Sequence, residues 1–260
     1  MTNKFSYKSY DQSLHNKLIF LEKNNFWFIS RNNLILFLLK KFRPNFKNLL
    51  EIGCGTGFVL KMIAENFQNS NILGTEIYES VVKIAKKRLI KLKNIKIFKM
   101  DARKMKQNNK YDIVAAFDVI EHIKEEAIVL NNIYKSLKQN GLLIITVPQH
   151  KFLWSIYDEI GFHQRRYSIK YVKFILSKNK FKIDYSTSFN SFLLPIMFLS
   201  RFLNKFKNIN NYDILHELKL GKTLNFLFKK ILEFELFLIK RGIRIKFGGS
   251  LVIVASKKNS

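Results

Sequence analysis

Residues 49–57 of this 260-residue chain read Leu49-Leu50-Glu51-Ile52-Gly53-Cys54-Gly55-Thr56-Gly57. A short apolar run ends in an acid, three glycines alternate with small residues, and a helical pattern begins at Phe58. Glycine lets backbone amides approach a ligand closely, and the first turn of a helix offers unpaired N–H groups. The stretch therefore predicts a strand, a tight turn and a helix that together cradle a nucleotide-like ligand.

The spacing of the glycines separates two kinds of nucleotide site. The dinucleotide fingerprint has two residues between its second and third glycines, whereas only Thr56 separates Gly55 from Gly57. Glu51 lies before the first glycine, where a carboxylate can bind a positively charged ligand group. Cys54 is the only cysteine of the chain, which excludes an internal disulfide. We interpret it as a small side chain that fills the turn.

Segments with strand and helix periodicity alternate along the chain, which predicts a largely parallel sheet. Strands are expected at residues 48–52, 72–77, 95–100, 112–117, 142–147, 181–186 and 250–255. Helices are expected at residues 58–67, 79–92, 125–138 and 169–178, with one or two more before residue 42. The helix at 125–138 is expected to end at a C-cap formed by Asn140 and Gly141.

Acids follow four of these predicted strands: Glu51, Glu76, Asp101 and Asp118. Open parallel sheets bind ligands beyond the carboxyl ends of their strands, so these acids are expected at one sheet edge. Glu76 lies about twenty residues past Gly57, where a carboxylate can accept hydrogen bonds from both ribose hydroxyls. Each acid alone has an alternative role as a helix cap, but four at one edge favour a ligand site.

Together these motifs resemble the class I S-adenosylmethionine-dependent methyltransferases. Residues 49–57 resemble the family's motif I, and residues 111–122 and 137–145 resemble its motifs around the fourth and fifth strands. Asn140 replaces a usual glycine and tolerates the left-handed conformation. Three segments resemble a subgroup of bacterial type 11 and type 23-like enzymes. The first is Phe26-Trp27-Phe28 with Arg31, and the last is Phe247-Gly248-Gly249. The middle segment combines Leu153-Trp154 with Asp158, His163 and Arg165-Arg166-Tyr167.

The resemblance implies an α/β, Rossmann-like fold with a seven-stranded, mostly parallel sheet whose last strand is antiparallel. It implies S-adenosyl-L-methionine as cofactor, with Asp101 accepting from the adenine amino group and the amide of Ala102 contacting the ring. Arg31 is a candidate for the cofactor's carboxylate, with a surface salt bridge as the equal alternative. The expected cofactor-binding residues are Arg31, Glu51, Gly53, Cys54, Gly55, Gly57, Glu76, Asp101, Ala102 and Asp118.

The expected organisation is a helical cap at residues 1–46, a cofactor-binding core at 47–188, a helical insertion at 189–247, and a final strand and tail at 248–260. The insertion combines the apolar run 192–199 with Arg201, Lys205 and Lys207. We favour a lid over the acceptor, and the alternative is a surface that contacts anionic membrane.

The expected reaction is O-methylation of a small molecule such as a sugar, a lipid-linked intermediate or a quinone-like phenol. His122 and His163 are the candidate catalytic residues, as competing general bases. Arg165, Arg166 and Tyr167 either bind an anionic acceptor or fix their loop. Asp118, Glu121 and His122 resemble the acid-x-x-Glu-His pattern of the ubiquinone-biosynthesis O-methyltransferases, which is linked to a divalent cation. We favour helix-capping acids in a turn, so no metal ligand is assigned.

The formal net charge of +27 is typical of proteins that bind nucleic acid or anionic membrane, but it is spread along the chain without a basic block. Two alternatives therefore remain: an RNA or protein methyltransferase, and a non-catalytic, basic membrane-docking protein on a relic fold. No Asn-Pro-Pro-Tyr-type motif follows the fourth predicted strand, which disfavours base or amide nitrogen methylation. Without a signal peptide or an apolar membrane span, a cytoplasmic location is expected, with the inner membrane face as alternative.

Overall fold

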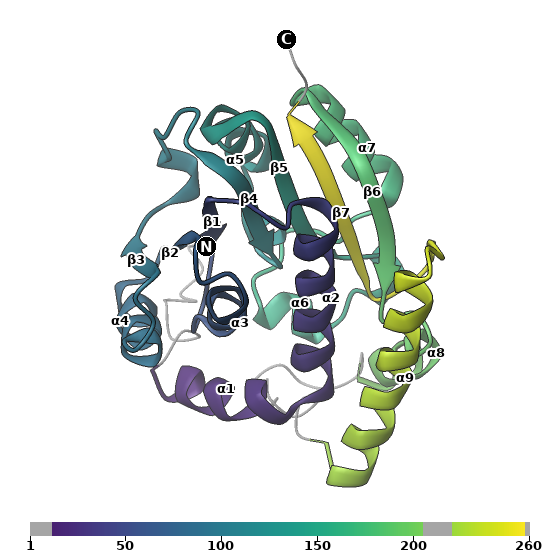
Figure 1. The fold of residues 1–260 in the computed structure, drawn as a ribbon. Coiled ribbons are helices and arrows are strands. Elements are labelled where there is room, and N and C mark those ends of the chain that lie inside the picture. The colour runs from purple at the N-terminus through teal and green to yellow at the C-terminus, as the bar shows by residue number, and fades with distance from the viewer. Residues whose placement is uncertain (1–11, 205–219, 258–260) are drawn as a thin grey trace, which may run out of the picture.

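The computed structural model describes residues 12–204 and 220–257 (Figure 1). Parts of the predicted cap (1–11), of the predicted insertion (205–219, with Lys205 and Lys207) and of the predicted tail (258–260) lie outside the described residues. The helices are α1 (Gln12–Asn24), α2 (Phe26–Phe42), α3 (Phe58–Asn66), α4 (Glu79–Leu89), α5 (Glu126–Ser136), α6 (Ile156–Ile160), α7 (Ile169–Lys178), α8 (Leu194–Asn204) and α9 (Lys222–Lys240). The strands are β1 (Asn48–Ile52), β2 (Asn71–Glu76), β3 (Ile95–Lys99), β4 (Tyr111–Phe117), β5 (Leu137–Pro148), β6 (Phe181–Phe189) and β7 (Ser250–Lys257).

Within the described residues the strands form one seven-stranded sheet in the order β3-β2-β1-β4-β5-β7-β6. The pairings among β1 to β5 are parallel, whereas β7 is antiparallel to both of its neighbours, β5 and β6. This confirms the predicted seven-stranded, mostly parallel sheet with an antiparallel last strand. The chain order reverses between β1 and β4, and ligands of open α/β sheets bind at such a switch point.

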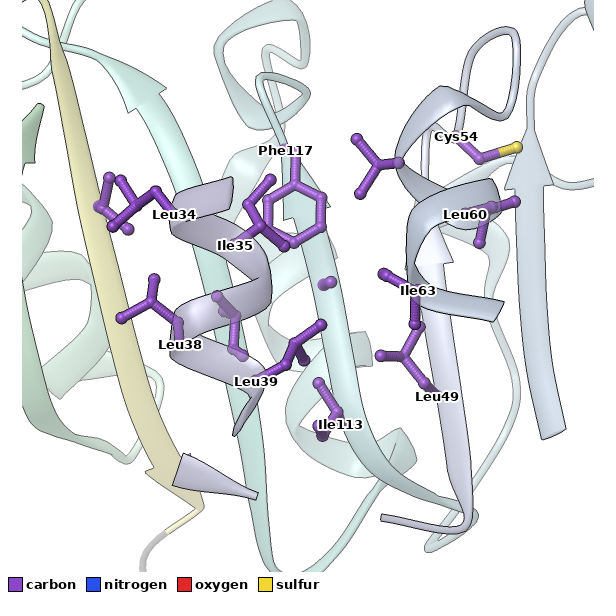
Figure 2. Close-up of a cluster of buried hydrophobic side chains, with 14 of the residues drawn as sticks. Leu34, Ile35, Leu38, Leu39, Leu49, Cys54, Leu60, Ile63, Ile113 and Phe117 are labelled. Carbon is purple, nitrogen blue, oxygen red and sulfur yellow. The ribbon is translucent and has the colours of Figure 1, made fainter. Parts of the chain in front are cut away.

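Both faces of the sheet are covered by helices, as a parallel sheet requires (Figure 1). Alternate residues of β4 point to opposite faces, so Ile113, Ala115 and Phe117 join one core cluster while Val114 and Ala116 join the other. The first cluster includes residues of α2, α3, α4 and α9, and the second includes residues of α5 and α7. Figure 2 shows the first cluster, with the side chains of α2 and α3 packed over β1 and β4.

Helices α2 and α9 pack beside each other on the same face of the sheet, and α2 carries Arg31, which pairs with Asp118 after β4. The buried residues Leu34, Ile35, Leu38 and Leu39 of α2 recur at helical spacing and form one apolar face. Asn25 caps its N-terminus by accepting from the Trp27 N–H at 2.9 Å. Asn225 of α9 accepts from the Phe26 N–H at 2.8 Å and donates to the Asn24 carbonyl at 2.9 Å, so α9 is fixed to the same end.

The predicted end of the helix before β5 is wrong. Helix α5 ends at Ser136, and the strand begins at Leu137, which is fully buried and pairs with Tyr111 of β4. The pairing register shifts between Tyr111 and Ile113, which leaves room for the extra residues of β5. Asn140 adopts φ 57° inside β5, so its predicted left-handed conformation is confirmed but its predicted place at a helix C-cap is not. Tertiary pairing thus overrides the local helix signal.

The segment between β6 and β7 contains α8 and α9. Arg201 of α8 donates to the Leu153 carbonyl at 3.0 Å, and α9 packs on α2. Among the described helices, none combines the length and apolar character needed to cross a membrane.

Candidate functional site

The turn between β1 and α3 requires glycine at two positions for packing and presents a third to open space. Gly53, Gly55 and Gly57 have φ values of 65°, 52° and 79°, all in the left-handed region. A Cβ at Gly53 would lie 2.5 Å from the Val119 side chain, and one at Gly57 would lie 2.7 Å from Leu89. At Gly55 a Cβ would meet no described atom within 4 Å. Gly55 is therefore the position where the turn can approach a ligand.

Glu76, the last residue of β2, holds this turn in place. Its Oε2 accepts from the Gly55 N–H at 3.1 Å, and its Oε1 accepts from the Ile77 N–H at 2.8 Å. The Cys54 N–H also donates to the Thr75 carbonyl at 2.9 Å, so the turn continues the pairing of β1 with β2. The carboxylate thus lies directly beside the glycines.

A cavity of about 500 Å³ opens next to the turn, at the carboxyl ends of β1 to β4. This volume lies within the range of small-molecule and cofactor sites, about 300–1,000 Å³. Of the predicted site residues, it is lined by Gly53, Glu76, Asp101, Ala102, Asp118 and His122. Apolar lining comes from Ile52, Ile77, Met100, Val119 and Ile123. The sheet therefore brings three of the four predicted acids to one cavity.

The other predicted residues, Arg31, Glu51, Cys54, Gly55, Gly57 and His163, do not line this cavity. Cys54 is buried against Gly74 and belongs to the core cluster around α3. Burial and the nearby carboxylates of Glu51 and Glu76 raise the pKa of its thiol, which keeps it protonated. This environment fits the interpretation of Cys54 as a small side chain that fills the turn.

Glu51 is buried at the end of β1, with only 2% of its surface exposed. Its Oε2 has no hydrogen-bond partner among the described residues. Burial raises the pKa of this carboxyl to about 8, while the Arg31 charge opposes and the Glu76 charge adds to the increase. Glu51 is therefore mostly protonated at neutral pH, and a cation placed beside it would favour the charged form.

Asp101 follows β3, and its carboxylate already accepts hydrogen bonds from a residue that is close to it in the chain. Its carboxylate accepts from the backbone N–H of Arg103 at 2.9 Å and from the guanidinium Nη2 at 2.8 Å. These contacts lower the pKa of Asp101, with the side-chain hydrogen bond from Arg103 as the main cause. The Arg103 side chain is 44% exposed, so it can rotate away when another donor reaches Asp101.

Arg31 forms an ion pair with Asp118, the residue that follows β4. The guanidinium also lies 4.5 Å from the centre of the Trp27 ring. The pair is mostly buried, so it differs from the surface salt bridge that the sequence offered as an alternative. A ligand carboxylate at Arg31 would have to share this guanidinium with Asp118, and that predicted role of Arg31 stays a prediction.

The two predicted catalytic histidines lie side by side although 41 positions separate them in the chain. The ring centroids of His122 and His163 are 4.6 Å apart, and the rings meet edge to face at 81°. Burial, followed by the nearby His163, lowers the pKa of His122 to about 4, so its ring is neutral at pH 7. His163 Nδ1 lies 2.8 Å from Asp158 Oδ1, which orients the ring and leaves its Nε2 for another partner.

Asp158 is the centre of a buried cluster that fixes the loop after β5. Arg166 Nε donates to its Oδ1 at 2.8 Å, and the Ser155 N–H donates to its Oδ2 at 2.9 Å. Burial alone would raise the pKa of Asp158, but the contacts with His163 and Arg166 and the charge of Arg201 lower it to about 2. The Ser155-x-x-Asp158 spacing of a capping box was a sequence signal for part of this cluster.

Arg165, Arg166 and Tyr167 all have partners in the protein. Arg165 Nη1 lies 2.9 Å from Glu126 Oε2, and the Tyr167 hydroxyl donates to the same oxygen at 2.6 Å. Arg166 also donates to the Gln149 carbonyl at 3.2 Å. These contacts fix the loop, which favours the second of the two roles that the sequence left open for this segment.

A second buried cluster, which sequence reasoning missed, joins α1 to the glycine turn. The Thr56 hydroxyl donates to Glu22 at 2.7 Å and accepts from Arg88 Nη1 at 2.7 Å, and Arg88 forms an ion pair with Glu22. The two charged side chains are each only 9% exposed. No local pattern connects these three residues, because they come from α1, the turn and α4.

Comparison with known proteins agrees with this geometry. The sequence model of a family described as "Methyltransferase domain" matches residues 50–143. Malonyl-[acyl-carrier protein] O-methyltransferase of Bacillus cereus is 27% identical over 103 residues, which are 40% of this chain and 38% of that protein. Malonyl-[acyl-carrier protein] O-methyltransferase 2 of Ilyobacter polytropus is 27% identical over 143 residues, 52% of this chain and 55% of that protein. The chain thus matches about half or less of the length of these curated relatives.

Among solved structures, phosphoethanolamine N-methyltransferase 2 of Haemonchus contortus in complex with S-adenosyl-L-methionine has a TM-score of 0.58 and 22% identity. The match covers 87% of this chain and 53% of that chain. At this identity the likeness concerns the fold. The matched residues 50–143 contain the glycine turn, Glu76, Asp101 and the His122 segment. The chain therefore has the fold of the class I methyltransferases, and its residues 50–143 match the sequence model of a methyltransferase domain.

Proposed function

We propose that this protein is an S-adenosyl-L-methionine-dependent methyltransferase that methylates an oxygen atom of a small or carrier-linked acceptor. The observation that carries this proposal is the cavity at the carboxyl ends of β1 to β4, which joins a left-handed glycine turn to Glu76 and Asp101. The methyltransferase domain at residues 50–143 supports it, as does the fold shared with a structure solved with S-adenosyl-L-methionine.

The residues around the cavity fit this cofactor. Gly55 faces open space, Glu76 offers a carboxylate for ribose hydroxyls, and Asp101 with Ala102 offers the cavity a carboxylate and a backbone amide that suit an adenine. Glu51 does not line the cavity itself but directly precedes Ile52 and Gly53, which do, and its buried carboxyl has an unpaired oxygen that suits the cofactor's amino group. When bound, S-adenosyl-L-methionine supplies an electrophilic methyl group, and the protein has to align the acceptor, exclude water and manage a proton.

His122 and His163 are placed to manage that proton. His122 lines the cavity with a neutral ring that can accept a hydrogen bond from an acceptor hydroxyl, but its pKa of about 4 makes it a weak base. His163 presents its Nε2 because Asp158 holds its Nδ1. An acceptor hydroxyl needs such a base, whereas an ionised carboxylate does not. Mutation of either histidine should therefore slow methyl transfer to a hydroxyl acceptor more than methyl transfer to a carboxylate acceptor.

Among oxygen acceptors, we favour an acidic one. The two curated relatives described above are named as O-methyltransferases of malonyl-[acyl-carrier protein], and the net charge of +27 favours anionic substrates and carriers. A sugar, a lipid-linked intermediate or a quinone-like phenol is the competing class. The proposed division into a cap (1–46), a core (47–188), an insertion (189–247) and a final strand (248–260) places the acceptor under the cap and the insertion.

Transfer from methyl-labelled S-adenosyl-L-methionine to a panel of acceptors tests this proposal. The panel holds malonyl-acyl carrier protein, a malonyl thioester without carrier, sugars, phenols, RNA and a protein mixture. We expect label in a small or carrier-linked oxygen acceptor, lost in Glu76→Gln. Label that enters RNA or protein instead would contradict the acceptor class. Binding of S-adenosylhomocysteine without transfer to any acceptor would favour the relic fold.

We further propose that α8 and α9 contact an anionic membrane surface. Exposed apolar side chains gather on them: Ile196, Phe198, Leu199, Phe202 and Leu203 on α8, and Leu224, Phe226, Leu227, Phe234 and Phe237 on α9. Exposed basic residues accompany them, including Lys222, Lys230 and Lys240. Apolar and basic groups together favour an anionic interface. A cytoplasmic location at the inner membrane face is the corresponding prediction.

Vesicle sedimentation tests this surface. Wild-type protein should sediment with phosphatidylserine-containing vesicles and far less with phosphatidylcholine vesicles. Phe198→Ser with Phe202→Ser should weaken sedimentation, and Ile90→Ser is the matched control, because Ile90 is 80% exposed at the end of α4. Equal sedimentation with both vesicle types, or equal effects of the two variants, would contradict the proposal.

A further inference from the structure

Three side chains able to bind a metal ion meet beside the cavity. Glu121 and His122 follow β4, and His163 lies in the loop after α6. One ligand atom from each lies within 4.8 Å of the other two. We propose that Glu121, His122 and His163 form a binding site for a divalent transition-metal ion such as Zn²⁺, and we refer to these three residues as the Glu-His-His cluster.

Unpaired polar atoms in the cluster point to a missing partner. Glu121 is fully buried, and neither of its carboxylate oxygens has a hydrogen-bond partner among the described residues. His122 Nδ1 is also buried without a partner in the described part of the chain. Burying a carboxyl without a hydrogen-bond partner is costly. A cation would compensate for the desolvation of Glu121 and use these unpaired donor atoms.

The third ligand is already oriented. Asp158 Oδ1 lies 2.8 Å from His163 Nδ1, so the free nitrogen is Nε2. A carboxylate that accepts from the second nitrogen of a ligating histidine is the usual outer partner of protein metal sites. Asp158 is itself held by Arg166 and by the Ser155 N–H, so these contacts fix the orientation of His163 through Asp158.

The chemistry of the donors selects the class of ion. Two imidazoles and one carboxylate suit Zn²⁺ and related transition metals, whereas Mg²⁺ and Ca²⁺ prefer oxygen ligands. Bonds of about 2.0–2.2 Å bring tetrahedral donors to roughly 3.4 Å from one another, so the three side chains would have to draw together. Asp118 is not available as a ligand in this arrangement, because it forms the ion pair with Arg31.

Nearby positive charge does not exclude the ion. Arg31 and Arg166 both approach Glu121 closely enough to affect its ionisation. Each guanidinium has a carboxylate partner, Asp118 for Arg31 and Asp158 for Arg166. Their charges are therefore largely compensated, so they add little repulsion against an ion at Glu121.

The position of the cluster gives the ion a role. Three protein ligands leave coordination positions open, and His122 lines the cavity. An ion there would bind the acceptor oxygen, so it would hold an acceptor carboxylate in place or lower the pKa of an acceptor hydroxyl. With the ion bound, the two imidazoles would be its ligands and would not act as the bases proposed above. This role rests on the proposed methyl transfer, whereas the metal binding itself does not.

Spectroscopic titration of the full chain tests the site directly. Protein dialysed against a chelator is titrated with Co²⁺, whose visible absorption reports nitrogen and oxygen ligation, and then with Zn²⁺ as competitor. We expect one equivalent of Co²⁺ to bind and Zn²⁺ to displace it. Glu121→Gln and His163→Gln should each weaken binding at least 100-fold, and Asp158→Asn should weaken it about 10–100-fold. His150→Gln should bind as wild type, since His150 is stacked against Phe152 and Phe247 instead.

Thermal melting keeps the test informative if a variant folds poorly. At 100 times Kd, Zn²⁺ should raise the melting temperature of the wild-type protein by roughly 5–10 °C. Substoichiometric Co²⁺ binding, no shift in melting temperature, or equal affinity in Glu121→Gln and His150→Gln would overturn the proposal. S-adenosylhomocysteine binding by the same preparations separates the two proposals, because protein that binds it but not metal contradicts only the metal site.

Discussion

Arg31 of α2 and Asp118 at the end of β4 form an ion pair across 87 positions of the chain. The side chains are 13% and 23% exposed, so the pair is mostly shielded from solvent. Asp118 lines the cavity, while Arg31 stands behind it against Trp27. The pair therefore links the N-terminal helices to the edge of the sheet where the ligand is expected.

Removing the Arg31 charge should destabilise the protein. Arg31→Met leaves Asp118 without its partner, and we expect the free energy of unfolding to fall by about 1–3 kcal/mol, less than for a fully buried pair. Urea denaturation measures the change. Lys106→Met, which removes an exposed charge, should change stability by less than about 0.5 kcal/mol. Equal stability of Arg31→Met and the wild type would show that the pair contributes nothing.

Substitutions of two glycines in the turn should have different effects, because one glycine is needed for packing and the other for the approach of the ligand. Gly57→Ala places a methyl group against Leu89 at positive φ, so we expect a loss of about 2–4 kcal/mol. Gly55→Ala meets no described atom and should cost about 1 kcal/mol, yet it should weaken S-adenosylhomocysteine binding. Urea denaturation and calorimetry measure the two effects. Equal losses of stability in the two variants would contradict these separate roles of Gly55 and Gly57.

The cluster of Glu22, Thr56 and Arg88 should be sensitive to loss of its cation. Arg88→Met leaves the buried Glu22 carboxylate without a charged partner, so a loss of about 3–5 kcal/mol is expected. Thr56→Val removes one hydroxyl and keeps the ion pair, and it should cost about 1–2 kcal/mol. Urea denaturation of both variants measures the difference. A smaller loss in Arg88→Met than in Thr56→Val would contradict the cluster as described.

Glu51 should make stability depend on pH. Its pKa in the folded protein is raised to about 8, above the ordinary value of about 4.5, so the folded state binds more protons between these values. Its contribution is therefore fully present below pH 4.5 and is lost as pH rises through 8. Glu51→Gln stays uncharged, so the wild type should become less stable relative to it between pH 5 and pH 9, by several kcal/mol.

Urea denaturation of both proteins at the two pH values measures this difference. Arg31 and Glu76 are the charged groups that act on Glu51, and both are present in each protein. Glu79→Gln, at an exposed glutamate of α4, is the matched control and should show no such trend. A constant difference between wild type and Glu51→Gln across the range would mean that Glu51 ionises normally.

The fold was largely predictable because its signals are local. The strand β1, with residues 48–52, and the helix α7, with residues 169–178, have the predicted bounds. The boundary between α5 and β5 was not predictable, because the pairing of Leu137 with Tyr111 depends on a neighbouring strand. The short helix α6 was also not predicted, since five residues carry too little periodicity.

The candidate site was predictable where each residue follows a strand, as Glu76, Asp101 and Asp118 do. Contacts between distant segments were not, because periodicity gives no information about side-chain partners. Thus the sequence suggested Arg31 as a ligand-binding residue without showing its pairing with Asp118. The sequence also did not show that Glu121 is a buried, unpaired carboxyl beside His163.

The most direct test of the central claim is calorimetric titration of the protein with S-adenosylhomocysteine. We expect binding with micromolar affinity, weakened about 10–100-fold in Glu76→Gln, because charged hydrogen bonds to the ribose are lost. Glu79→Gln, three residues further on and outside the cavity, should bind as the wild type does. No binding by folded wild-type protein, or equal binding by Glu76→Gln, would contradict the claim that this cavity is the cofactor site.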